Sequence, residues 1–189
     1  MELYLHVRVL FSMILGLGVS HLLGGVARMV QHPKAYKPYW VHLVWTAFLF
    51  LYLIHFWWWE FGLHRVREWT FPLYLFIALY AVIMYLQCTL LYPVSLSDYH
   101  GFFDYYYSRQ AWIFGLMALL FVADFVDTLA KGVGYLETLG PLYYVRTGSC
   151  LLLCLAAMKV KNHVFHAAFA VYATAAEIVM ILHSYRTIQ

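Results

Sequence analysis

The chain has 189 residues, of which 65% are hydrophobic and 11% are charged, and its formal net charge at pH 7 is +3. Soluble domains carry roughly 25% charged residues. Together with a mean hydropathy of +0.72, this composition excludes an ordinary soluble domain and predicts an integral membrane protein. The 12 Lys and Arg residues are too few and too scattered for a nucleic-acid-binding protein.

Six apolar windows are long enough to cross a bilayer, which takes about 20 mostly apolar residues. These windows are Leu3–Ala27, Trp40–Phe61, Thr70–Tyr92, Ala111–Ala130, Pro141–Met158 and Val164–Tyr185. The connections between them are short. The sequence therefore predicts a single all-α transmembrane domain over residues 1–189, built as a compact bundle of six transmembrane helices with no soluble domain and no linker.

The connection Val94–Arg109 is unusually aromatic, and Tyr105, Tyr106 and Tyr107 are consecutive within it. Such a segment is too apolar to extend freely into water. We expect it to lie on the membrane surface or to pack against a partner. A homo-oligomer, or a subunit of a larger membrane complex, is the corresponding prediction for the assembly.

Orientation follows from the Lys and Arg residues near the ends of the spans. These residues are divided almost evenly between the two sides, and the strongest cluster is Arg28–Lys37 in the first connection. This cluster favours a cytoplasmic first connection and places both termini in the periplasm.

A shift of 103 residues aligns the two halves of the chain. It lays Arg28 over Lys131, Pro38 over Pro141 and His21 over Asp124. Three spans per half give the halves opposite orientations, and inverted repeats of this kind build many secondary transporters. The alignment predicts half-repeats at residues 1–93 and 104–189, while chance coincidence between apolar segments remains the alternative.

Ionisable residues inside the spans are the main functional signal, because an uncompensated charge at the centre of a bilayer costs at least ~2.5 kcal/mol. Arg146 lies near the start of the fifth window, at a depth close to that of Asp124 and Glu177. We expect it to face Asp124, Asp127 or Glu177. The candidate residues for an ion or solute pathway are Asp124, Asp127, Arg146, Glu177, His55, Glu60 and His21. The alternative is a structural ion-pair network near the membrane surface.

Histidines support a second hypothesis, a bis-histidine haem b electron carrier, because such a haem takes one imidazole from each of two facing helices. Histidines form two layers, and the members of each layer lie at similar depth. His6, His55 and His183 lie near one side of the membrane, and His21, His42 and His166 lie near the other. The spacing opposes this hypothesis, since His42 and His55 lie about 140° out of register on a helix. No cofactor is the favoured prediction, and no metal site is assigned.

No phosphate-binding glycine loop, metalloprotease helix or nucleophile elbow occurs, so no catalytic residue is assigned and we expect a protein that is not an enzyme. The favoured hypothesis is a small carrier or channel that moves protons, ions or a small solute through an intramembrane Asp/Glu/Arg cluster. The alternatives are a non-enzymatic accessory or self-associating subunit, and the haem carrier.

Two short segments carry a resemblance. They are Ser20–Gly25, with the sequence SHLLGG, and Leu91–Gly101, which contains Leu-Tyr-Pro and Asp-Tyr-His-Gly. They resemble a group of small bacterial polytopic inner-membrane proteins that has no assigned role, and the likeness covers the first two thirds of the chain. The resemblance implies a bacterial inner membrane and carries over no catalytic or binding residue.

Overall fold

The computed structural model describes residues 2–66 and 68–184, with the backbone alone at residues 2–6, 64 and 65. This described part of the chain is all-α, with seven α-helices, one 3-10 helix and no strand. The elements in chain order are α1 (Glu2–Gln31), α2 (Trp40–Trp59), the 3-10 helix η1 (Glu60–Arg65), α3 (Phe71–Leu91), α4 (Phe102–Ala130), α5 (Val133–Thr138), α6 (Gly140–Ala157) and α7 (His163–Ser184).

Five of these helices are long and apolar enough to cross a membrane: α1 from Val7, α2 with η1 to Leu63, α3, α4 and α7. The prediction of a polytopic helical membrane protein is therefore confirmed. The fifth predicted window corresponds to α6, which has 18 residues, contains Arg146 and does not belong to these five. The short helix α5 was not predicted.

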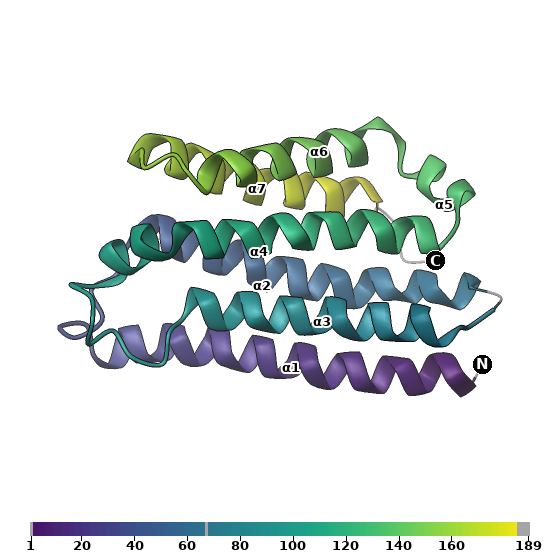
Figure 1. Cartoon of the computed structure of the whole chain (residues 1–189), viewed down its shortest axis with the longest axis horizontal. Helices are drawn as coiled ribbons and strands as arrows, with labels where there is room; N and C mark the ends of the chain where they lie inside the picture. Colours follow the sequence, from purple (N-terminus) through teal and green to yellow (C-terminus); the bar gives the residue numbers. More distant parts are fainter. Residues whose placement is uncertain (1, 67, 185–189) are drawn as a thin grey trace.

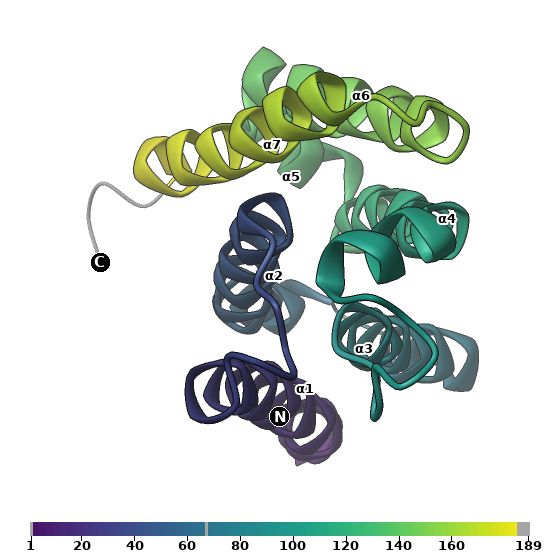
Figure 2. The ribbon, with the colours of Figure 1, turned by 90° about the vertical axis from the view of Figure 1, so that its left-hand side faces the viewer.

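The helices form three tiers of two when the bundle is viewed from one end (Figure 2). The outer tiers are α1 with α3 and α6 with α7, and α2 and α4 lie between them; α2 contacts α7, and α4 contacts both α3 and α6. The start of α1 and the end of α7 lie at the same end of the bundle (Figure 1). We call this the terminal end. That residues 1–93 and 104–189 are inverted repeats of each other stays a prediction.

The prediction that residues 94–109 form a surface segment is wrong for its second half, because α4 begins at Phe102, nine residues before the predicted window. Gly101 precedes this helix with φ of 134°, a conformation that favours glycine. Phe102, Tyr105 and Tyr106 are buried in the bundle. Aromatic residues that looked too apolar for a loop therefore extend a core helix.

Local sequence explains where several helices begin and end. Pro72 lies in the first turn of α3, where its missing N–H leaves no hydrogen bond unmade, and the Thr70 hydroxyl accepts a hydrogen bond from the Leu73 N–H at 3.5 Å. Pro141 has the same place in α6. At the other end of α3, Tyr92 precedes Pro93, and the residue before a proline is disfavoured in the helical conformation.

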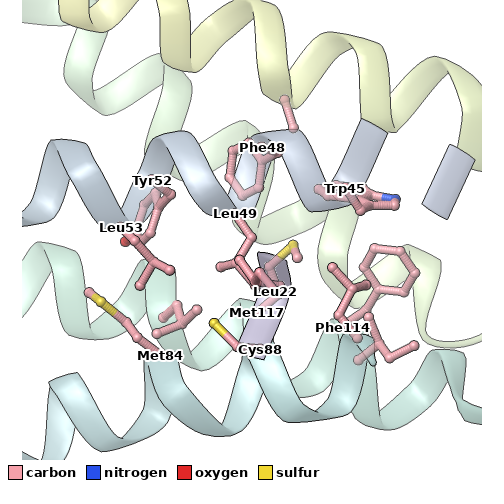
Figure 3. Packing of buried hydrophobic residues seen from close by; sticks show 14 of the residues in the cluster. Leu22, Trp45, Phe48, Leu49, Tyr52, Leu53, Met84, Cys88, Phe114 and Met117 are labelled. Atoms are coloured by element: carbon pink, nitrogen blue, oxygen red, sulfur yellow. The ribbon is translucent and has the colours of Figure 1, made fainter. Parts of the chain in front are cut away.

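An apolar layer crosses the middle of the bundle. It consists of Leu22 from α1, Phe48 and Leu49 from α2, Cys88 from α3 and Met117 from α4, all at most 2% exposed. These side chains meet between Tyr52 on one side and Trp45 on the other (Figure 3). The layer separates the polar groups of the terminal end from those of the opposite end.

Candidate functional site

Four helices bring charged side chains together inside the terminal end. Nδ1 of His55 on α2 lies in hydrogen-bond contact with Oε1 of Glu177 on α7. Oε2 of Glu177 accepts a hydrogen bond from Nε of Arg146 on α6 at 2.9 Å and lies 2.7 Å from Nη2 of the same guanidinium. Arg146 Nη1 lies 3.6 Å from Oδ2 of Asp124 on α4. We call these four residues the arginine cluster.

Neutral hydroxyls complete the surroundings of Asp124. The Tyr143 hydroxyl donates to Oδ2 of Asp124 at 3.1 Å and also lies 2.9 Å from the Thr128 hydroxyl. Asp124 is 8% exposed, and its Oδ1 accepts no hydrogen bond from a side chain or backbone group in the described part of the chain. One oxygen of this carboxylate is therefore available to a further group.

A second group of charges, the lysine cluster, lies where α2 and α4 end. The Lys131 ammonium donates to Oε1 of Glu60 at 2.8 Å and to Oδ2 of Asp127 at 2.5 Å. Burial lowers the pKa of Lys131, but the two carboxylates outweigh that effect and raise the pKa above its usual value. The second oxygens, Glu60 Oε2 and Asp127 Oδ1, accept no hydrogen bond from any described residue.

Trp59 lies between the two clusters. Its ring is 5.4 Å from that of His55 and 6.3 Å from that of Tyr143, while the Lys131 ammonium is 5.6 Å from its centre. The indole therefore contacts members of both clusters. An aromatic ring can stabilise a nearby cation through its face, and Lys131 is the cation near this ring.

Negative charge is in excess in the two clusters taken together. They contain the four carboxylates of Asp124, Asp127, Glu60 and Glu177 but only the two permanent cations of Arg146 and Lys131. His55 is the remaining titratable member. All of these residues are at most 8% exposed. The arrangement can bind protons or another small cation, because uncompensated charge is costly in a low-dielectric interior.

The opposite end of the bundle buries its polar groups differently, around the end of α3. Three backbone carbonyls there accept side-chain hydrogen bonds: Leu90 from the Tyr105 hydroxyl at 2.5 Å, Leu91 from His42 Nε2 at 2.7 Å and Tyr92 from His21 Nε2 at 2.8 Å. The last carbonyls of a helix have no partner within it. These donors are therefore structural caps.

Close packing holds this capped end together. A Cβ atom placed on Gly25 of α1 would lie 2.3 Å from the Tyr92 ring. The Tyr92 hydroxyl in turn lies 3.0 Å from that of Thr46. The two segments whose sequences resemble the bacterial group, Ser20–Gly25 and the start of Leu91–Gly101, thus meet in space.

The remaining histidine candidates have separate surroundings. His166 Nε2 donates to the Val160 carbonyl at 2.7 Å, which leaves Nδ1 to accept the Tyr106 hydroxyl at 2.9 Å. His21, His42 and His166 thus each use Nε2 to hold a backbone carbonyl. His183 is exposed, and the side chain of His6 lies outside the described residues. Among the described residues, no three His, Cys, Asp or Glu are grouped to hold a metal.

Sequence reasoning placed some of these residues correctly. Arg146 meets both Glu177 and Asp124, as its depth predicted. The candidate His21 lies at the opposite end, away from both clusters, where it caps α3, and its part in a pathway stays a prediction. Tyr143, Thr128 and Trp59 were not singled out, although Thr128 lies one turn after Asp124 on the same helix face and could have been found from that spacing.

Comparison of the chain with protein-family models, with curated proteins and with solved structures found no match.

Proposed function

We propose that the protein is a small membrane carrier. It moves protons, ions or a small solute across the bilayer and couples this movement to proton binding in the arginine cluster. The observation that carries this proposal is the excess of buried carboxylates over permanent cations across the two clusters. A purely structural network is stable when its charges balance. Here balance requires additional positive charge, and protons are the most readily available source.

Glu177 is the central member of the proposed site. It is 0% exposed, and it contacts Arg146 through one oxygen and His55 through the other. Two titratable groups thus share a contact beside a fixed cation. A proton gained or lost by either of them changes the attraction between α2, α6 and α7, and this change is the coupling that a carrier needs.

The apolar layer supports a carrier rather than an open channel. Phe48, Leu49 and Met117 fill the bundle between the arginine cluster and the opposite end. A proton bound at Glu177 therefore exchanges with the terminal side, and its passage to the other side requires the helices to rearrange. Alternating access of a bound solute to the two sides of a membrane works in this way.

The membrane and the orientation belong to the same proposal. We place the chain in a bacterial inner membrane with α6 as a sixth span, the terminal end in the periplasm and the basic connection Arg28–Lys37 in the cytoplasm. On this proposal, a cysteine at Lys34 escapes an impermeant thiol reagent applied to intact cells and reacts after the cells are opened. Labelling in intact cells would reverse the orientation.

The decisive experiment measures proton flux in proteoliposomes with an internal pH-sensitive dye and an imposed potassium diffusion potential. Glu177→Gln keeps the shape of the side chain but cannot exchange a proton, so we expect flux to fall about tenfold or more. The matched control is Glu137→Gln, the same chemical change at an exposed position of α5 near the terminal end. The control should retain the flux of the unmodified protein.

Folding must be measured in parallel by thermal unfolding of each variant. Full flux in well-folded Glu177→Gln protein would remove Glu177 from the mechanism. If the unmodified protein gives no flux above that of empty liposomes, the carrier proposal fails and the clusters are a structural network.

A further inference from the structure

A small cavity adjoins the arginine cluster, on the side of the cluster that faces Trp59. It offers about 10 Å³ to the centre of a water-sized sphere. One water molecule needs roughly 10–15 Å³ by this measure, so the cavity accommodates a single particle of that size. Its lining consists of Tyr52, His55, Phe56, Trp59, Asp124 and Arg146.

Arg146 is the permanent cation of the lining, but the carboxylates of Asp124 and Glu177 together outnumber it, so the surroundings of the cavity carry net negative charge when His55 is neutral. Asp124 contributes a carboxylate whose Oδ1 has no hydrogen-bond donor among the described residues. The guanidinium of Arg146 is already engaged by Glu177 and Asp124, so it has little attraction left for an anion. Tyr52, Phe56 and Trp59 contribute aromatic rings to the lining, and aromatic rings attract cations at their faces. Protein cations already use this attraction, since Arg146 lies 6.0 Å from the Tyr52 ring and the Lys131 ammonium 5.6 Å from the Trp59 ring.

The chemistry of the lining also distinguishes among cations. Hard metal ions such as Ca²⁺ require six to eight oxygen ligands, and Mg²⁺ requires an octahedral set, whereas only Asp124 and Tyr52 among the lining residues carry a side-chain oxygen, and the Tyr52 hydroxyl already lies 2.7 Å from that of Tyr80. Ammonium has the size of a water molecule. It donates hydrogen bonds to a carboxylate and is attracted to aromatic rings.

We propose that this cavity binds one ammonium ion, held by Asp124 and surrounded by Tyr52, Phe56 and Trp59. The inference depends on the proposed carrier function, because it names the solute that the same site would move. An ammonium ion here supplies the positive charge that the arginine cluster lacks when His55 is neutral. Binding of ammonium and binding of a proton by the cluster then compete.

Binding is tested on the purified full-length protein in detergent, by thermal unfolding in ammonium chloride and in sodium chloride at equal ionic strength and fixed pH. A ligand that binds only the folded protein raises the unfolding temperature in proportion to the logarithm of its concentration once the site is saturated. We expect this rise with ammonium and none with sodium. Methylammonium, which is larger by one methyl group, should have no effect in so small a cavity.

Two variants of Asp124 show whether the site is the one proposed. Asp124→Asn removes the charge and should weaken ammonium binding about tenfold or more. Asp124→Glu keeps the charge beside Arg146 but adds a methylene group toward a cavity of about 10 Å³, so it should also abolish the ammonium effect if Asp124→Asn fails to fold. The exposed control Glu137→Gln should leave the ammonium effect unchanged.

The outcomes separate this inference from the proposed function. If ammonium and sodium stabilise equally while proton flux remains sensitive to Glu177→Gln, the cavity holds water, and the inference fails while the carrier stands. If ammonium stabilises selectively and both Asp124 variants abolish the effect, the site is supported whether or not flux is found. An ammonium effect that survives both Asp124 variants would place the ion elsewhere and overturn the inference.

Discussion

The two ends of the bundle bury polar groups by opposite means. At the terminal end, opposite charges such as Glu177 and Arg146 meet from different helices. Around the end of α3, neutral donors such as His42 and His21 hold backbone carbonyls instead. Each donor at the α3 end is fixed by a partner that cannot titrate. The terminal end combines several titratable groups with surplus negative charge, so it is the end at which a proton can arrive without breaking a helix cap.

The comparison also separates two uses of histidine. His55 contacts the carboxylate of Glu177 on another helix. His42 donates from Nε2 to the Leu91 carbonyl and stacks on the Phe102 ring at 4.5 Å. The presence of a histidine inside a span therefore says little about its role, and the partner of each ring nitrogen says more.

The largest expected effect is that of Arg146→Met. Removing one partner of a buried ion pair leaves the other charge uncompensated, which typically costs about 3–5 kcal/mol, and here both Glu177 and Asp124 would lose their cation. Thermal or denaturant unfolding in detergent measures the loss. Arg109→Met, at an exposed position of α4, is the control and should change stability little. Equal stability of the two variants would show that the arginine cluster is open to water.

A smaller effect is expected at the α3 end from Gly25→Ala. The added Cβ would lie 2.3 Å from the Tyr92 ring, so α1 must move away from the end of α3. Overpacking of this kind typically costs about 1–3 kcal/mol. Gly24→Ala is a matched control on the next residue, where the nearest atom is the Arg28 Nη1 at 3.9 Å, and it should be neutral or slightly stabilising. If the two variants are equally stable, the close contact of α1 with Tyr92 is not as described.

The smallest effect is expected from His42→Phe. The ring keeps its stacking on Phe102, but the Leu91 carbonyl loses its donor. A buried carbonyl left without a partner costs about 1–3 kcal/mol, and we expect the lower part of this range because the carbonyl ends a helix. Unfolding in detergent should show the loss, whereas proton flux per folded molecule should not change. A selective loss of flux would mean that the two ends are coupled and that the contrast between them is incomplete.

Depth along the helices was the part of the site that the sequence could predict. Hydropathy located the long helices, and a rise of 1.5 Å per residue put Arg146 near Asp124 and Glu177. Rotation of each helix about its axis and the order of neighbouring helices depend on packing between distant segments. Depth alone therefore could not reveal that Lys131 reaches Glu60, 71 residues away, or that His21 turns toward the end of α3.

The boundary of α4 shows a second limit. The aromatic segment before Arg109 was assigned to the membrane surface or to contact with a partner because it is too apolar to extend freely into water. Tyr106 is instead buried, with its hydroxyl bonded to Trp45 and His166. A buried tyrosine is acceptable when its hydroxyl has a partner, and that partner cannot be known before the fold.

The apolar layer also has an electrical consequence. The membrane potential is worth about 2.3 kcal/mol per elementary charge for each 100 mV, and the field is strongest where the interior is least polarisable. Leu22, Phe48, Leu49, Cys88 and Met117 form such a region, whereas the terminal end contains several charged and polar side chains. On the proposed function, a proton that reaches Glu177 from the terminal side crosses only a small part of the voltage drop. The voltage dependence of the proposed carrier should instead belong to the rearrangement that carries the charge past this layer.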